Sequence, residues 1–139
     1  MRVLIDTNVA LDVLLKRSPF YQDSFAIFQL ADRERIQGRI SAVSVTDIFY
    51  LLRKGQRNSS GVYTVMDELT TLLSIIPVTK TTITKALALR WQDFEDAVQY
   101  IAAQENGIEY IITRNEADYE TSEIHCISPT DFIAYTQRL

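Results

Sequence analysis

The first fifteen residues, MRVLIDTNVALDVLL, constrain the fold of this chain more than any other segment. The apolar run from Val3 to Ile5 predicts a buried strand, and it ends abruptly at Asp6. Apolar residues resume with helical spacing over Val9–Leu15, so we expect a helix to follow the acid directly. This junction places the Asp6 carboxylate at the carboxyl end of a strand, where open parallel sheets bind ligands. A carboxylate there needs a cation or hydrogen-bond donors to offset its desolvation.

Apolar runs and helical patterns alternate along the rest of the chain. Strands are expected at Arg2–Ile5, Arg39–Ala42, Leu73–Val78, Glu109–Thr113 and Ile124–Ile127. Helices are expected near Val9–Leu15, Tyr21–Arg33, Val45–Arg53, Val62–Leu72, Thr82–Arg90, Glu95–Glu105 and Thr130–Arg138. The alternation predicts an α/β fold with a mainly parallel sheet. We expect a single domain over residues 1–139, because this length suits one hydrophobic core.

The composition excludes several common kinds of site. No apolar run approaches the roughly 20 residues that span a bilayer, so no membrane partner is expected. One cysteine excludes an internal disulfide framework and suits a reducing compartment, so we expect a cytoplasmic protein. One histidine excludes multi-histidine zinc sites, and the four glycines form no phosphate-binding loop. The net charge of −4 argues weakly against broad non-specific binding of nucleic acid.

Acidic residues recur at the starts of the expected helices. Asp47 ends the segment SVTD, and Asp93 and Asp96 frame the segment DFED. Both segments are typical of capping boxes, and Asp6 by itself is typical of a helix N-cap. Each acid therefore has a structural explanation, although Ser, Thr or Asn would cap these helices equally well.

Taken together, the acids favour a shared site. If the first, second and fourth strands are neighbours, the side chains that follow them converge on one crevice. The expected members are Asp6, Asp47, Asp96, Asn115 and Asp118, with Asp93 as a secondary acid. Carboxylates this close together require either a raised pKa at one of them or a bound cation. Because the set offers oxygen donors and no histidine, it predicts Mg²⁺ or Mn²⁺ and not zinc.

An acidic site of this kind suits phosphodiester hydrolysis, in which metal ions orient a water and stabilise the leaving oxygen. The carboxylates are then ligands and need not attack the phosphate. Asn8 is expected to orient Asp6 or a metal-bound water, and Thr113 to touch the edge of the site, although turn hydrogen bonds explain either residue. Arg114 is expected to contact a phosphate of the substrate or a structural carboxylate.

Four segments match a known family in order and spacing. They are DTNV from Asp6, SVTD from Ser44, DFEDA from Asp93 and ITRNEADY from Ile112. These segments resemble the PIN domain family, and the nearest branch is similar to the bacterial VapC-type toxins. The resemblance runs from Met1 to about Phe132, where ISPTDF is similar to the closing segment of the family. It implies a three-layer α/β/α sandwich around a central parallel sheet of about five strands.

The resemblance also implies a function. PIN domains of this branch are metal-dependent endoribonucleases, and toxin members form a homodimer and pair with a small antitoxin protein in a type II system. The family positions for catalysis carry over to Asp6, Asp47, Asp96 and Asn115. The metal-binding positions carry over to Asp6, Asp96 and Asp47, with Asp118 as a further ligand.

Two alternatives to a nuclease stay open. Asp47 stands where the family more often has Glu, and Asn115 stands where many members carry a fourth acid. These departures favour a catalytically weak PIN-like module that binds RNA or a protein. The second alternative is a phosphatase with Asp6 as nucleophile, although Asn8 stands where such enzymes place a second acid.

Overall fold

A parallel five-stranded sheet forms the centre of the protein in a computed structural model that describes residues 1–55, 58–120 and 123–139. The strands are β1 (Arg2–Ile5), β2 (Gln37–Ser41), β3 (Ser74–Ile76), β4 (Tyr110–Ile112) and β5 (His125–Ile127). Their order is β3-β2-β1-β4-β5, and every neighbouring pair is parallel. Strand β1 therefore lies between β2 and β4, as the convergence of the acids requires. The α/β class and the parallel sheet expected from the sequence are confirmed.

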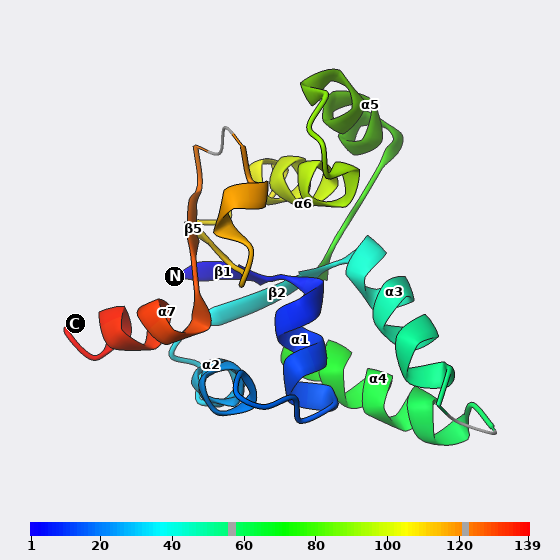
Figure 1. The fold of residues 1–139 in the computed structure, drawn as a ribbon, viewed down its shortest axis with the longest axis vertical. Coiled ribbons are helices and arrows are strands. Elements are labelled where there is room, and N and C mark those ends of the chain that lie inside the picture. Colours follow the sequence, from blue (N-terminus) through cyan, green and yellow to red (C-terminus); the bar gives the residue numbers. More distant parts are fainter. Residues whose placement is uncertain (56–57, 121–122) are drawn as a thin grey trace.

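Helices cover both faces of the sheet (Figure 1). On one side lie α1 (Thr7–Leu14), α2 (Tyr21–Asp32), α4 (Ser60–Leu72) and α7 (Pro129–Thr136). On the other side lie α5 (Lys80–Leu89) and α6 (Phe94–Glu105), while α3 (Ala42–Arg53) leaves the end of β2 and the short 3₁₀ helix η1 (Glu116–Asp118) follows β4. This is the three-layer α/β/α arrangement. Among the described residues, no helix combines the length and the apolar character needed to cross a membrane.

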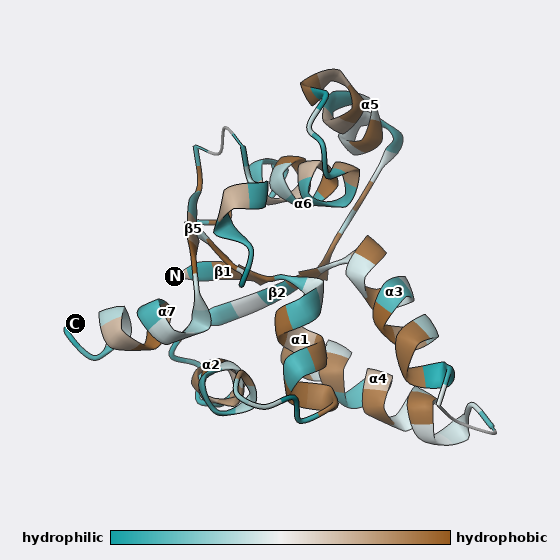
Figure 2. Cartoon of the chain, viewed as in Figure 1, coloured by the Kyte–Doolittle hydropathy of each residue, from teal (hydrophilic) through white to brown (hydrophobic). Residues whose placement is uncertain are grey.

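The core has two parts because successive side chains of a strand point to opposite faces of the sheet. Val3 and Ile5 of β1 pack into the core beneath α1, α2 and α4, and Leu4 packs into the core beneath α5 and α6. All three side chains are fully buried. Figure 2 shows the hydrophobic colour along most of β1 and on parts of α1 and α4. The buried strands therefore hold the junctions that follow them in fixed positions.

Helix α3 begins three residues earlier than expected, which changes the interpretation of Asp47. The hydroxyl of Ser41 is the N-cap and accepts a hydrogen bond from the Ser44 backbone N–H at 3.2 Å. The predicted capping box of Ser44 and Asp47 is therefore wrong, because β2 passes into the helix without a loop. Ser44 is buried within the helix, and Asp47 lies in its middle with no capping role.

The caps expected at Asp6 and Asp93 are confirmed. Asp6 accepts a hydrogen bond from the Thr7 N–H at 2.8 Å, and Asp93 accepts one from the Asp96 N–H at 3.1 Å. At its other end, α6 stops at Gly107, whose φ of 65° is accessible to glycine at little cost. The Ile108 N–H then bonds to the Ala103 carbonyl oxygen at 3.1 Å and completes a Schellman turn.

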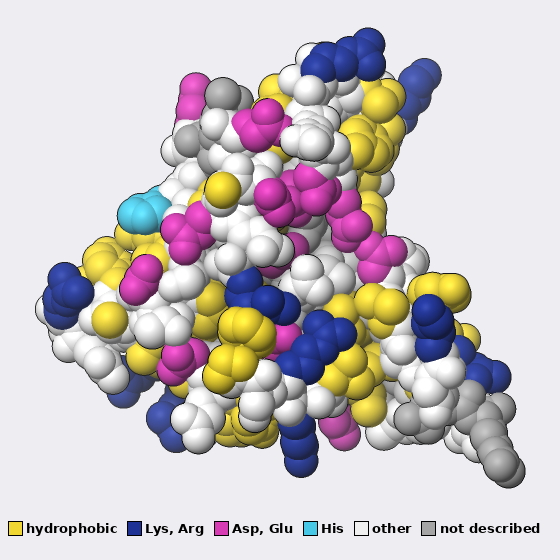
Figure 3. Space-filling model, viewed as in Figure 1, with side chains coloured by type: hydrophobic (Ala, Val, Ile, Leu, Met, Phe, Trp, Pro, Cys, Tyr) yellow, Lys and Arg dark blue, Asp and Glu magenta, His cyan; other side chains and the backbone are white. Residues whose placement is uncertain are grey.

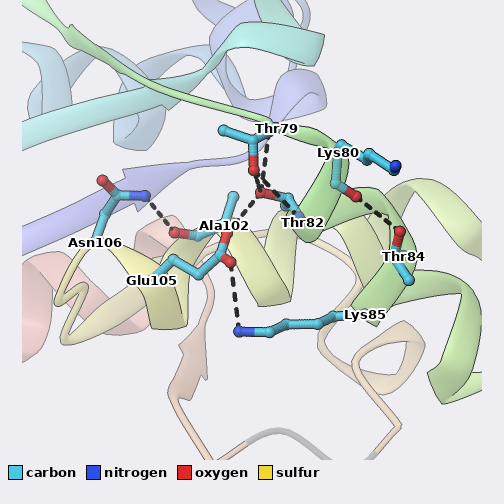
Figure 4. A network of polar contacts seen from close by, with 8 residues as sticks. All are labelled: Thr79, Lys80, Thr82, Thr84, Lys85, Ala102, Glu105 and Asn106. Carbon is cyan, nitrogen blue, oxygen red and sulfur yellow. Dashed lines mark hydrogen bonds and ion pairs between the residues drawn. The ribbon is translucent and has the colours of Figure 1, made fainter.

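A polar network ties α5 to the C-terminal half of α6 (Figure 4). Thr79 and Thr82 form a reciprocal capping box at the start of α5. The Thr82 hydroxyl donates to Glu105 of α6 at 2.6 Å, and the Lys85 ammonium lies 3.6 Å from the same carboxylate. Helix α6 is thereby held at the end opposite to Asp93 and Asp96.

Candidate active site

An acidic hollow of about 330 Å³ opens at the carboxyl edge of the sheet, where β1, β2 and β4 end. Its acidic lining residues are Asp6, Asp47, Asp93, Glu95 and Asp96. Asn8 and Asn115 also line it, and the exposed side chains of Tyr50 and Leu51 flank it. Figure 3 shows carboxylate side chains gathered on this face of the molecule. Residues separated by more than a hundred positions in the chain therefore share one site.

Asp6 is the most buried acid of the hollow. The hydroxyl of Thr113 donates to its Oδ2 at 2.7 Å, and the side-chain amide of Gln99 lies 3.5 Å from its Oδ1. Burial raises the pKa of Asp6 above its usual range, while these donors act in the opposite direction. Together with the Thr7 N–H, these groups orient the carboxylate from the start of α1, from α6 and from the end of β4.

Asp96 lies close enough to several other acids to be repelled by them. Asp93, Asp96 and Asp118 each place one carboxylate oxygen within 4.8 Å of the others. Desolvation, together with repulsion from Asp6, Asp93 and Asp118, raises the pKa of Asp96 to about 8. A site that offers oxygen donors and opposes the ionisation of its own carboxyls fits a hard dication such as Mg²⁺ or Mn²⁺.

Asp47 enters the hollow from α3 and faces the N-terminal turn of α6. It shares a hydrogen bond with Glu95, and this bond, together with burial, raises the pKa of Glu95 to about 7. Glu95 was not expected in the site, because capping explains the DFED segment through its first and last residues. The available signal was a further acid between these two residues.

A buried glutamine that was not expected in the site links the acids to α3. Gln99 is 1% exposed, and its amide nitrogen donates to the Ser44 hydroxyl at 3.1 Å. Ser44 also shares a 2.7 Å hydrogen bond with the Thr7 hydroxyl. The one signal for Gln99 in the sequence is its spacing, since it lies three residues after Asp96 and shares a helix face with it.

Arg114 contacts a carboxylate and lies at the border of the hollow. Its Nε lies 2.7 Å from Oδ2 of Asp12, a fully buried residue of α1 that the sequence analysis did not select. Of the two expectations for Arg114, the structure shows the structural carboxylate. The next residue, Asn115, bonds through its backbone N–H to the Thr113 hydroxyl at 3.0 Å and lines the hollow.

Comparison with known proteins assigns the family. A model of the PIN domain matches residues 2–117, which is most of the chain. The chain belongs to the PIN domain family. Ribonuclease VapC1 of Aquifex aeolicus is 24% identical to this PIN domain over 136 residues, covering 94% of the chain and 92% of the relative. The family expected from the four sequence segments is confirmed.

Solved structures share the fold of this PIN domain. The DNA-bound VapBC complex of Salmonella typhimurium contains a chain that superposes with a TM-score of 0.71 at 15% identity, covering 93% of this chain and 98% of that one. A toxin–antitoxin complex from Klebsiella pneumoniae contains a chain with a TM-score of 0.67 at 21% identity. The superposition covers 91% of this chain and 97% of that one. At these identities the likeness establishes the three-layer PIN fold.

The raised pKa values predict how pH changes the stability of the metal-free protein. The folded state holds protons on Asp96 and Glu95 more tightly than the unfolded chain does, because both pKa values are raised. This stabilisation is complete below the ordinary carboxyl pKa and is lost as the pH rises to about 7 for Glu95 and about 8 for Asp96. We therefore expect the melting temperature in EDTA to fall between about pH 5 and about pH 8.

Mn²⁺ is expected to reverse this trend, because a dication binds the deprotonated carboxylates of the folded state. The increase in melting temperature on adding Mn²⁺ should therefore be larger at about pH 8 than at about pH 5. The Asp96→Asn variant is the control and should show a flatter pH profile in EDTA. An Mn²⁺ effect of equal size at both pH values would contradict the link between the acid cluster and the cation.

Proposed function

We propose that this PIN domain is a metal-dependent endoribonuclease that hydrolyses RNA phosphodiester bonds, and that it acts as the toxin of a toxin–antitoxin pair. The observation that carries the proposal is the convergence of Asp6, Asp96 and Asp118 on one oxygen-rich edge of the sheet. Membership of the PIN family and the likeness to a relative named as a ribonuclease support the same reaction.

Different residues of the chain would bind the cation and the substrate. Asp93, Asp96 and Asp118 would hold a divalent cation, with Asp6 beside them and Asp47 across the hollow. When bound, the cation would acidify a water and stabilise negative charge on the scissile phosphate. Thr113 and Gln99 fix the orientation of the Asp6 carboxylate, so that it need not reorganise when substrate binds. The amides of Asn8 and Asn115 supply neutral groups at the mouth of the hollow for a phosphate oxygen or a water.

A small antitoxin protein is the partner that the toxin assignment requires. The Klebsiella pneumoniae structure is a toxin–antitoxin complex, and its fold likeness supports a partner of this kind. We also propose a homodimer, as the resemblance to the toxin branch implies.

Cleavage of single-stranded RNA by the purified protein tests the function. We expect cleavage in Mg²⁺ or Mn²⁺, no cleavage in EDTA, and recovery when either cation is restored. RNA binding without cleavage in both cations would favour the weak binding module instead. Hydrolysis of a phosphomonoester with a phosphoaspartate trapped on Asp6 would favour the phosphatase.

A further inference from the structure

A second pocket lies beside the acidic hollow, on the far side of Arg114. Its volume is about 550 Å³, within the range of ligand sites. Pro19, Phe20 and Ser24 form one wall, and the start of α7 at Pro129 forms another. Arg114 lines this pocket, while its neighbour Asn115 lines the acidic hollow. Two consecutive residues after β4 therefore line the two pockets. Figure 3 shows basic and hydrophobic side chains side by side below the acidic cluster.

A flat platform of arginine and phenylalanine forms part of the pocket wall. The guanidinium carbon of Arg114 lies 4.0 Å from the ring centroid of Phe20. The Arg114 Nη2 donates to Asp12 at 3.3 Å and its Nε is ion-paired with the same carboxylate, so the plane of the guanidinium is held in place. Phe20 nevertheless remains 40% exposed. A group that stacks here meets a surface that is already ordered, which lowers the entropy cost of binding.

Two polar side chains, Ser24 and Asp23, belong to the wall of the pocket. The hydroxyl of Ser24 is fully buried and has no hydrogen-bond partner among the residues that the structure describes. Buried hydroxyls are normally bonded, and leaving one unpaired is costly. The Asp23 carboxylate accepts a 2.6 Å hydrogen bond from the Thr130 hydroxyl and can accept another from a ligand. Because Ser24 has no accessible surface, the Asp23 carboxylate is the group of this pair that a ligand can reach, and the pocket combines a stacking surface with this acceptor.

We propose that this pocket binds one nucleobase of the RNA substrate, a few nucleotides from the scissile phosphate, an inference that rests on the proposed nuclease function. Single-stranded RNA is recognised largely by stacking of its bases on aromatic rings and guanidinium planes. A phosphate is excluded as the occupant because Asp23 would repel it. The same carboxylate accepts a hydrogen bond from a base amino group, so the pocket prefers cytosine to uracil.

Binding of short RNAs in EDTA tests the pocket without relying on cleavage. The probes are fluorescein-labelled oligo(C) and oligo(U) of about 12 nucleotides, a length within the site size of single-strand binders. Wild-type protein should bind oligo(C) more tightly, and Phe20→Ala should weaken that binding about 5- to 150-fold. Phe20→Trp should retain it, because indole also offers a stacking face. Phe25→Ala is the matched control, since Phe25 is equally exposed on α2 and does not line the pocket.

Substitution of Asp23 tests the base preference. Asp23→Asn replaces an acceptor with an amide that can donate to the uracil carbonyl, so the preference should shift toward oligo(U). In cleavage assays Phe20→Ala should raise KM and leave kcat unchanged, because the pocket binds substrate away from the reacting atoms. Unchanged binding of both oligonucleotides by Phe20→Ala would overturn the proposal. A protein partner would then be the remaining candidate ligand of the pocket. Binding that depends on Phe20 in a protein that cleaves no RNA would support the pocket and overturn the nuclease.

Discussion

Asp6→Asn and Asp96→Asn are each expected to lower the rate of RNA cleavage by about a thousandfold or more. Both substitutions preserve the size of the side chain and remove one negative charge from the hollow. A cation and the transition-state charge that it stabilises together contribute several kcal/mol, and each 1.36 kcal/mol is a tenfold change in rate. In Asp6→Asn the new amide also disturbs the hydrogen bond from Thr113, which now donates to Oδ2 at 2.7 Å.

Stability measurements separate this loss of activity from unfolding. In the folded protein the Asp96 carboxyl favours its protonated form, since its pKa is raised to about 8. Its negative charge therefore lowers the stability of the metal-free protein. Removing its charge should therefore maintain or increase the melting temperature in EDTA at about pH 8. A variant that is more stable and inactive is the expected signature of a residue that serves function at a cost to stability.

Two further substitutions complete the test, one away from the acid site and one within it. Asp67→Asn changes an exposed acid of α4 and should leave cleavage within about twofold of the wild type. Asp118→Asn tests whether the triple of Asp93, Asp96 and Asp118 holds the cation, and it should raise the Mn²⁺ concentration needed for half-maximal activity. If Asp6→Asn or Asp96→Asn cleaves RNA at the wild-type rate, the acidic hollow is not the active site.

The sequence was sufficient to predict the sheet and the location of the acids. Strand β1 has a continuous apolar run, and its end at Asp6 agrees with the structure to the residue. This succeeds because both signals are local: burial selects apolar residues, and the strand–helix junction selects a cap. The start of α3 was predicted less well, because Ser41 and Ser44 are equally good caps and only the length of β2 decides between them.

The contacts that orient the acids were harder to predict because they join distant segments. Gln99 bonds to Ser44 across 55 positions and Thr113 bonds to Asp6 across 107 positions. A buried glutamine and a surface glutamine on a helix have the same local pattern, so only the packed structure distinguishes them. The same holds for Asp12, which lies in an apolar helix and has its closest cationic partner, Arg114, 102 positions along the chain.

Arg114→Met is expected to destabilise the protein by about 3 kcal/mol, the lower end of the usual cost of breaking a buried ion pair, because Arg17 remains near the Asp12 carboxylate. Asp12 is fully buried on α1, and Arg114 is the nearer of its two cationic partners at 2.7 Å. Methionine preserves most of the length and apolar volume of the arginine stem. The decrease in the free energy of unfolding therefore measures the effect of removing the positive charge. Urea unfolding with a constant m-value is the measurement, because it compares the free energy of unfolding directly.

Arg17→Met is the matched control for this buried charge. The Arg17 guanidinium lies 3.6 Å from Asp12 and its side chain is 37% exposed, against 25% for Arg114. The Asp12 carboxylate keeps its closer partner Arg114 at 2.7 Å in this variant, so Arg17→Met should lose less stability than Arg114→Met. The double variant Asp12→Leu/Arg114→Met should recover most of what Arg114→Met loses, because it removes both charges from the interior. Equal losses in Arg17→Met and Arg114→Met would mean that compensation of Asp12 does not depend on Arg114, and that the Phe20 platform is held by other contacts.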